Sequence, residues 1–193
     1  MPPTPRRLRA VGKARRAKAK KPELRRVACL LVLSLAIISE VPVSVAKAES
    51  SELAGGWHFV RTPNPRGGAD AVSIMHTADT SRSDVDLVGL MIRCREAGTE
   101  IVIVALRSFP LRAQPSVVVG KPGREARFQG TIAAPGTAIL LPGDASAIVS
   151  GSWKDLGDLF IRVEDGQSTI RGIIHVDGLQ SAFKYLAANC PGP

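Results

Sequence analysis

The sequence predicts a mainly β (α+β) fold: a single antiparallel, sandwich-like β-rich domain with one C-terminal helix, closed by a disulfide. Three observations lead to this fold class. Short apolar or alternating runs, bounded by glycine and proline, fill the chain from Trp57 to Val176. A stretch with helical spacing of apolar residues follows near the C-terminus. Two cysteines, far apart in the sequence, remain once an N-terminal leader is set aside.

Each expected strand is a short run that ends at glycine, proline or a polar turn. Gly55-Gly56 precedes the first run, and Pro63 ends it. The run 100–106 is the most apolar of the chain, which predicts an internal strand of the sheet. The expected strands are 57–61, 71–76, 87–93, 100–106, 116–119, 126–132, 159–164 and 169–176.

Polar segments rich in turn-forming residues separate these runs and predict three turns, at 95–98, 121–124 and 165–167. Two further segments stay open in type. No element is assigned to 138–141, and 144–149 is either a short helix or a strand.

The one well-marked helix is expected after Asp177, whose carboxylate can accept hydrogen bonds from the N–H groups of the first turn. Gln180 completes a capping box, and Pro191 ends the helix. The apolar residues form one face that predicts packing against the core. They are Leu179, Ala182, Phe183, Leu186 and Cys190.

The first 48 residues predict a cleaved signal peptide. Its basic region is 1–26 and its apolar run is 27–39, and the small residues Ala46 and Ala48 place cleavage after Ala48. The alternative is a retained membrane anchor. As a helix, however, the apolar run reaches only about 20 Å, against roughly 30 Å for the hydrocarbon core of a bilayer.

Export makes the domain 49–193 periplasmic or secreted, and the membrane is met only through the leader before cleavage. We expect the general secretory route, because the residues after Arg25-Arg26 do not suit a twin-arginine signal. The long basic region leaves open whether translation starts at Met1.

The charge distribution argues against a nucleic-acid partner. The chain has 26 basic and 17 acidic side chains, giving a net charge of +9. However, 12 of the basic and only two of the acidic residues lie in 1–48. The remaining 14 basic and 15 acidic residues give the domain a net charge of −1. A near-neutral domain has no bulk attraction for a phosphate backbone.

The cysteines predict one disulfide. Cys29 leaves with the leader, so Cys94 and Cys190 remain as an even pair in an oxidising compartment. Two free thiols are the alternative reading. A redox-active pair is disfavoured, because such pairs usually form a Cys-X-X-Cys turn.

The sequence predicts no catalytic or metal site. The histidines His58, His76 and His175 have no ligand spacing, and no cofactor is expected. The serines of 150–152 lack the frame of a nucleophile turn, and the acidic residues of 155–165 suit solvated hairpin edges. If Arg61, Arg93, Arg95 and Arg162 met on one sheet face they would form an anion site, but solvated strand faces are the commoner arrangement of such residues.

Several short motifs together resemble a known family. They are Gly-Gly-Trp57, Met91-Ile92-Arg93-Cys94-Arg95-Glu96, Thr99-Glu100, Leu159-Phe160-Ile161-Arg162-Val163, and Asp177-Gly178-Leu179 with Ala182, Leu186 and Cys190. Over 55–190 the chain resembles the VasI/TagO-like periplasmic accessory proteins associated with type VI secretion. The resemblance implies a non-enzymatic envelope protein that contacts other proteins or the cell wall. It carries over no catalytic residue.

Two function classes follow, with a hydrolase disfavoured by the missing motifs. The first is a periplasmic interaction domain, an accessory to a cell-envelope or type VI secretion assembly, which binds envelope proteins through edge strands and the tip near Gly166. The second is a small-ligand or cell-wall-glycan binding module. Its candidate binding surface contains Trp57, Trp153 and Arg162, although buried tryptophans are an equally open reading.

Overall fold

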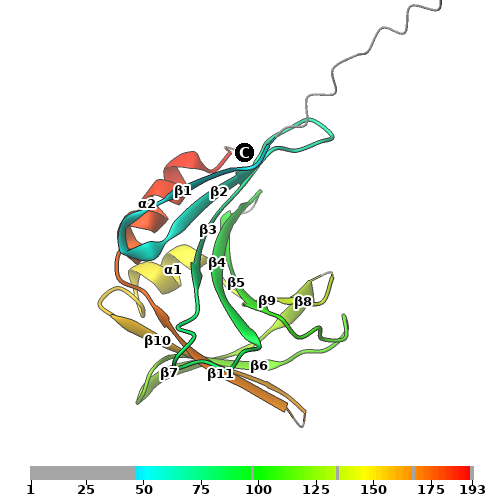
Figure 1. Ribbon diagram of the computed structural model, residues 1–193, viewed down its shortest axis with the longest axis vertical. Coiled ribbons are helices and arrows are strands. Elements are labelled where there is room, and N and C mark those ends of the chain that lie inside the picture. Colours follow the sequence, from blue (N-terminus) through cyan, green and yellow to red (C-terminus); the bar gives the residue numbers. More distant parts are fainter. Residues whose placement is uncertain (1–46, 97, 134, 167, 192–193) are drawn as a thin grey trace, which may run out of the picture. The chain divides into compact units, whose positions relative to one another are not determined.

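The alternating apolar runs form two antiparallel sheets in the computed structural model of the protein (Figure 1). The structure describes residues 47–96, 98–133, 135–166 and 168–191. The basic region and apolar run of the expected leader lie outside the described residues, as does Ala46. None of the helices in the described part of the chain is long and apolar enough to cross a membrane.

The larger sheet has seven strands in the order β1-β2-β3-β4-β5-β9-β8. They are β1 (Glu49–Glu52), β2 (His58–Thr62), β3 (Ala71–Thr77), β4 (Leu87–Arg95), β5 (Gly98–Ala105), β8 (Thr131–Ala133) and β9 (Ala138–Leu140). Strand β5 pairs with β4 and β9, which confirms that the most apolar run is internal. The segment 138–141, to which no element was assigned from the sequence, contains β9. Strand β1 is fully exposed and is missing from the sequence prediction, because it has no apolar residue.

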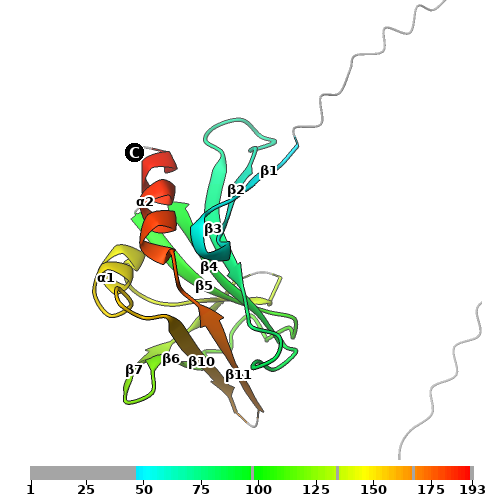
Figure 2. The same ribbon diagram turned by 60° about the vertical axis from the view of Figure 1, so that its left-hand side comes forward.

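The smaller sheet has four strands, which Figure 2 shows side by side in the order β7, β6, β10 and β11. They are β6 (Ser116–Lys121), β7 (Arg124–Gln129), β10 (Asp158–Asp165) and β11 (Ser168–His175). The antiparallel pairs β4–β5, β6–β7 and β10–β11 lie on either side of the three predicted turns, so each turn joins the strands of a hairpin. Of the residues assigned to their turns, Ala97 and Gln167 lie outside the described residues.

One predicted strand, 126–132, is wrong as a single element. Its first part belongs to β7 of the smaller sheet and its end to β8 of the larger sheet. The chain changes sheet at Gly130, where a Cβ atom would lie 2.5 Å from Ile139 Cγ2. A side chain at this position would keep the backbone from passing between the sheets, so the change of sheet depends on glycine.

Both sheets turn apolar side chains toward one common core. The larger sheet contributes a row of buried residues that face one another across four strands. They are Phe59, Ile74, Ile92 and Ile101. Alternate residues of β10, beginning with Leu159, face the same core from the smaller sheet. We call these the inner faces of the sheets and the opposite ones the outer faces.

Two helices cover the inner face of the larger sheet (Figure 1). Helix α2 (Leu179–Asn189) packs against β3 and β4, and α1 (Ala145–Ser150) packs against β5 and α2. The Gln180 side-chain amide donates a hydrogen bond to the Val149 carbonyl oxygen at 2.7 Å, which joins the two helices. The segment 144–149, open between helix and strand, is therefore largely helical.

The predicted cap of α2 at Asp177 is wrong. The N-cap is Gly178, with a φ of 74°, and no side chain caps the helix. The Asp177 carbonyl oxygen instead accepts a hydrogen bond from Trp57 Nε1 at 3.1 Å. The Gln180 side chain does not cap α2 but donates its hydrogen bond to the Val149 carbonyl oxygen of α1. The contact of Asp177 with Trp57, which is distant in the sequence, therefore takes the place of the predicted capping box.

The predicted disulfide is confirmed. Cys94 and Cys190 form a bond with a Cα–Cα distance of 5.6 Å, and it joins the end of β4 to the residue after α2. The two cysteines lie 96 residues apart in the chain. A crosslink over a loop of this length restricts the unfolded chain strongly.

Replacing both Cys94 and Cys190 by serine should lower the free energy of unfolding by about 2–5 kcal/mol, because the unfolded chain regains the freedom of the closed loop. Urea unfolding of the two proteins measures the difference. Wild-type protein kept reduced should unfold at the midpoint of the double variant. Equal midpoints for the oxidised wild type and the double variant would contradict a stabilising role for the bond.

Asp144 fixes the start of α1 to the larger sheet. Its carboxylate accepts hydrogen bonds from the Ser146 hydroxyl, from the Ser146 backbone N–H at 3.1 Å and from the Thr99 hydroxyl at 3.0 Å. The bonds from Ser146 are the main cause that lowers the pKa of the Asp144 carboxyl below its usual value. Folding therefore stabilises the ionised form of the Asp144 carboxyl relative to its protonated form.

The Asp144→Ala variant should lose about 1 kcal/mol of stability at neutral pH, the usual value of an N-cap. Because the folded pKa is lowered, this stabilisation is present above about pH 4 and is lost as the pH falls through the folded pKa. Urea unfolding at neutral and acidic pH should show the difference between wild type and variant shrinking in acid. Asp144→Asn, which keeps the cap without the charge, is the control and should stay near wild type at neutral pH. A difference independent of pH would contradict the assignment.

Candidate functional site

The two tryptophans of the expected binding surface lie in the core, which corrects that expectation. Trp57 is 0% and Trp153 is 2% exposed. The Trp57 ring packs edge-on against His76, and its N–H donates a hydrogen bond to the Asp177 carbonyl oxygen. The inner faces need large apolar side chains where the helices meet the sheet, so neither ring is available to stack on a sugar.

The four arginines considered as an anion site do not form a cluster. Arg61 donates a hydrogen bond to the Asn189 side chain of α2, at 3.0 Å. Arg93 and Arg95 both form ion pairs with Glu100 on the outer face of the larger sheet. Of the four arginines, Arg162 is the one on the outer face of the smaller sheet. Its neighbours there include Arg82 and Arg171.

Two adjoining hollows on this outer face form what we call the Phe160 groove. The first has a volume of about 360 Å³ and the second of about 550 Å³, and Phe160 and Pro122 line both. The first hollow is lined by three arginines, Arg82, Arg162 and Arg171, and by one acidic residue, Glu125. The second contains three aspartates with one lysine, which are Asp155, Asp158, Asp177 and Lys121. The groove therefore has a basic half and an acidic half on either side of an aromatic ring.

The aromatic ring is open to solvent because of its neighbours on the sheet. Phe160 is 37% exposed and stands opposite Ile173 on one side and Gly120 on the other. Gly120 has a φ of +149°, and a Cβ there would lie 2.6 Å from the Arg124 carbonyl oxygen. The twisted β6–β7 hairpin thus requires glycine, and the missing side chain leaves one flank of Phe160 bare.

The basic half brings two like charges face to face. Arg162 and Arg171 are directly opposed residues of β10 and β11. Arg162 Nε lies 3.0 Å from Glu164 Oε1, yet it is buried and makes no hydrogen bond within the described residues. The Arg171 guanidinium has no ion pair among the described residues. Like charges in direct opposition on a sheet destabilise the fold, so this pair is not explained by stability.

Arg82 reaches the groove from a loop, 78–86, that covers the free edge of β11. Asp79 and Asp84 donate backbone N–H groups to the Ile173 and Arg171 carbonyl oxygens at 2.9 and 2.8 Å. The Ser83 hydroxyl and the Asp84 carboxylate accept the backbone N–H groups of the same two strand residues. The loop therefore satisfies the edge of the sheet and holds Arg82 over its face.

Ion pairs join Arg82 to the acidic half. Its guanidinium bonds to Asp79 at 2.6 Å and to Asp158 at 3.1 Å, and His175 Nδ1 lies 2.8 Å from Asp158 Oδ1. Hydrogen bonds from Ser81 and Arg82 hold the pKa of Asp79 far below its usual range. The same carboxylates raise the pKa of Arg82. This network keeps Arg82 charged and fixed in place.

The network does not have the geometry of a nucleophile with its base. His175 Nε2 lies 3.2 Å from Arg82 Nη2 and 3.4 Å from Asp79 Oδ2, so both of its ring nitrogens face network partners. The nearby hydroxyls are directed elsewhere: Ser81 donates to Asp79 and Ser83 to the Ile173 carbonyl oxygen. Within residues 47–191 as described, no three histidine, cysteine or acidic side chains are grouped to hold a metal.

Sequence reasoning found Arg162 but missed Phe160, Arg82 and Arg171. The useful signal was the alternation of β10, which places Phe160, Arg162 and Glu164 on the face opposite Leu159 and Ile161. The same alternation places the aromatic ring of Phe160 on the solvent side of β10, next to Arg162. Arg82 carries no such signal, because its place depends on a loop that is not periodic.

Comparison with models of protein families, with curated proteins and with solved structures found no match for this chain. The resemblance to VasI/TagO-like proteins therefore stays a prediction of the sequence motifs, and the groove has to be interpreted from its own chemistry.

Replacing Arg171 by threonine should raise the free energy of unfolding by about 0.2–1 kcal/mol, because the opposed like charges are relieved. Urea unfolding at low and high salt measures the gain, which should shrink as salt screens the repulsion. Arg127→Thr is the matched control. Arg127 lies on the same face but pairs with Glu164 at 3.2 Å, so its loss should not stabilise the protein. A destabilised Arg171→Thr would show that the repulsion is absent.

Proposed function

We propose that this protein is a non-catalytic binding domain of the cell envelope, which docks an extended segment of a partner protein in the Phe160 groove. The observation that carries the proposal is the opposed pair Arg162 and Arg171 on an open sheet face. Such a pair costs stability in the free protein. An anionic group that binds between the two guanidinium groups would offset this cost.

The polarity of the groove favours a polypeptide as the occupant. A segment that lies across both hollows places an acidic side chain at the arginines, an apolar side chain on Phe160 and a basic side chain at Asp155 and Asp158. Oppositely charged halves also fix the direction in which the segment binds. A single small anion would use only the basic half.

The cellular place of this activity rests on the sequence. The predicted leader directs the chain out of the cytoplasm, and the disulfide is consistent with an oxidising compartment. The family resemblance makes a type VI secretion assembly the first class of partner to test. The alternative, a cell-wall-glycan module, loses the two tryptophans as stacking platforms and would rely on Phe160 alone.

A site-specific photocrosslinker tests the proposal. The protein is expressed with a benzophenone amino acid at position 160 and irradiated in intact cell envelopes. The matched control carries the same group at position 185, because Tyr185 is similarly exposed at 44% but lies on α2. Position 160 should give a crosslink to an envelope protein, within a segment that contains both acidic and basic residues.

Charge reversal shows whether the crosslink depends on the groove. Adding Arg162→Glu and Arg171→Glu should abolish the product at position 160, because both anion-binding side chains now repel a carboxylate. Crosslinks that persist after charge reversal, or that appear equally from position 185, would contradict the proposed site. Crosslinks to cell-wall fragments alone would favour the glycan module.

A further inference from the structure

A row of side chains crosses the outer face of the larger sheet, whereas the Phe160 groove lies on the smaller sheet. Strand pairing places Glu52 opposite His58, His58 opposite Met75, and Met75 opposite Met91. The row continues from Met91 to Val102. Three potential metal ligands, from three different strands, are thus direct neighbours.

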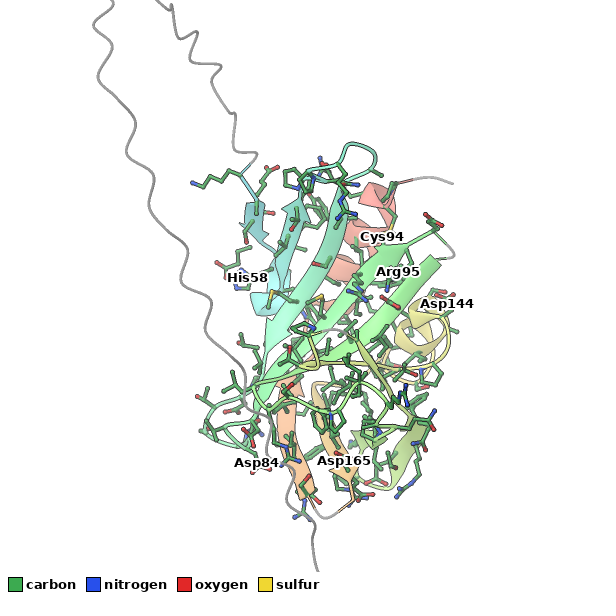
Figure 3. All side chains as sticks on the ribbon, turned by 90° about the vertical axis from the view of Figure 1, so that its right-hand side faces the viewer. His58, Asp84, Cys94, Arg95, Asp144 and Asp165 are labelled. Atoms are coloured by element: carbon green, nitrogen blue, oxygen red, sulfur yellow. A yellow bond between two sulfur atoms is a disulfide. The ribbon has the colours of Figure 1, made fainter. Side chains whose placement is uncertain are left out.

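This row is open to solvent at its His58 end and closed at its other end, where Val102 is buried. The helices pack on the inner face, and Figure 3 looks onto the outer face with His58 labelled on it and the helices behind. His58 is exposed, and Met75 and Met91 are half-buried. The His58 ring has no hydrogen-bond partner among the described residues, so neither ring nitrogen is already engaged there.

The spacing suits convergence on one atom. Directly opposed residues have Cβ atoms about 4.5–5.5 Å apart. A methionine side chain has three rotatable bonds, which lets its sulfur adjust over such a distance. Met75 stands between His58 and Met91, so an ion above Met75 is within reach of both neighbours.

The chemistry of the donors selects the ion. Thioether sulfurs are soft ligands that favour Cu(I), and imidazole also binds copper. Both cysteines of the domain are held in the disulfide, so the two methionines are the soft donors that remain under oxidising conditions. Hard ions prefer several oxygen ligands, and Glu52 is the one carboxylate in this part of the row.

We propose that His58, Met75 and Met91 form a binding site for one soft monovalent cation, Cu(I) or its analogue Ag(I). His58 supplies a ring nitrogen, and the two methionines supply their sulfur atoms. Histidine spacing along the chain gives no sign of the site, because each ligand comes from a different strand and two of the three are methionines.

Competition with a chromogenic Cu(I) chelator tests the site. All proteins are expressed from the full-length chain with Cys29→Ser, which removes the free thiol, and are kept oxidised. The wild-type site should take one equivalent of Cu(I) from the chelator and should not retain Zn(II). Met75→Leu, Met91→Leu and His58→Asn should each weaken binding by at least about tenfold. Leucine keeps the volume of methionine, so the fold should persist.

His175→Asn is the matched control, since His175 is also partly exposed but lies on β11 of the other sheet, and its Cu(I) affinity should equal that of the wild type. A second measurement does not depend on variants: Ag(I) should shift the methyl NMR signals of both Met75 and Met91. Unshifted methyl signals, no retained copper, or equal losses in His175→Asn and the three ligand variants would each overturn the proposal.

Discussion

The attachment of α2 to the larger sheet at both ends is the constraint on which the rest of the domain depends. At its C-terminal end the Cys94–Cys190 bond fixes the helix to β4. At its N-terminal end two backbones meet so closely that a Cβ at Gly55 would lie 2.0 Å from the Asp177 carbonyl oxygen, and one at Gly178 2.5 Å from that of Ala54. Both glycines have positive φ, so this contact needs glycine on each side. With the helix fixed, the inner face of the sheet is closed and the core is complete.

Closing the inner faces leaves the outer faces as the place where function can reside. The outer face of the smaller sheet carries ion pairs and, beside them, one arrangement that does not favour the fold, the direct opposition of Arg162 and Arg171. The outer face of the larger sheet carries the cross-strand row of His58, Met75 and Met91. The two surfaces differ in chemistry, and the proposed ligands are accordingly a charged polypeptide for one and a soft ion for the other.

Local pattern was enough to predict the fold class, and non-local contact explains what it missed. Apolar alternation identifies β3, β4 and β10, because one face of each strand is buried. The pattern fails at Gly130, where the strand is divided by a contact with Ile139 that is distant in sequence. It fails again at Asp177, whose capping role is replaced by the bond from Trp57.

The candidate sites show the same limit. Arg162 could be placed on an exposed face from alternation alone, but its opposition to Arg171 depends on the register of β10 with β11. From the sequence, Trp57 and Trp153 could lie either on the surface or in the core, because aromatic character alone does not distinguish these locations. The structure places both in the core. Register and loop placement come from the whole fold, and these decide which side chains meet.

The position of the disulfide also sets an order of events during biogenesis. Among residues 47–191 Cys94 and Cys190 are the only cysteines, so oxidation within the domain has one product and needs no reshuffling. Strand β5, helix α2 and all the elements between them lie in the chain between the two cysteines. Cys94 therefore stays a free thiol until the whole of this stretch has been synthesised. Oxidation of the pair then reports that the chain from β4 to the end of α2 has been made and folded together.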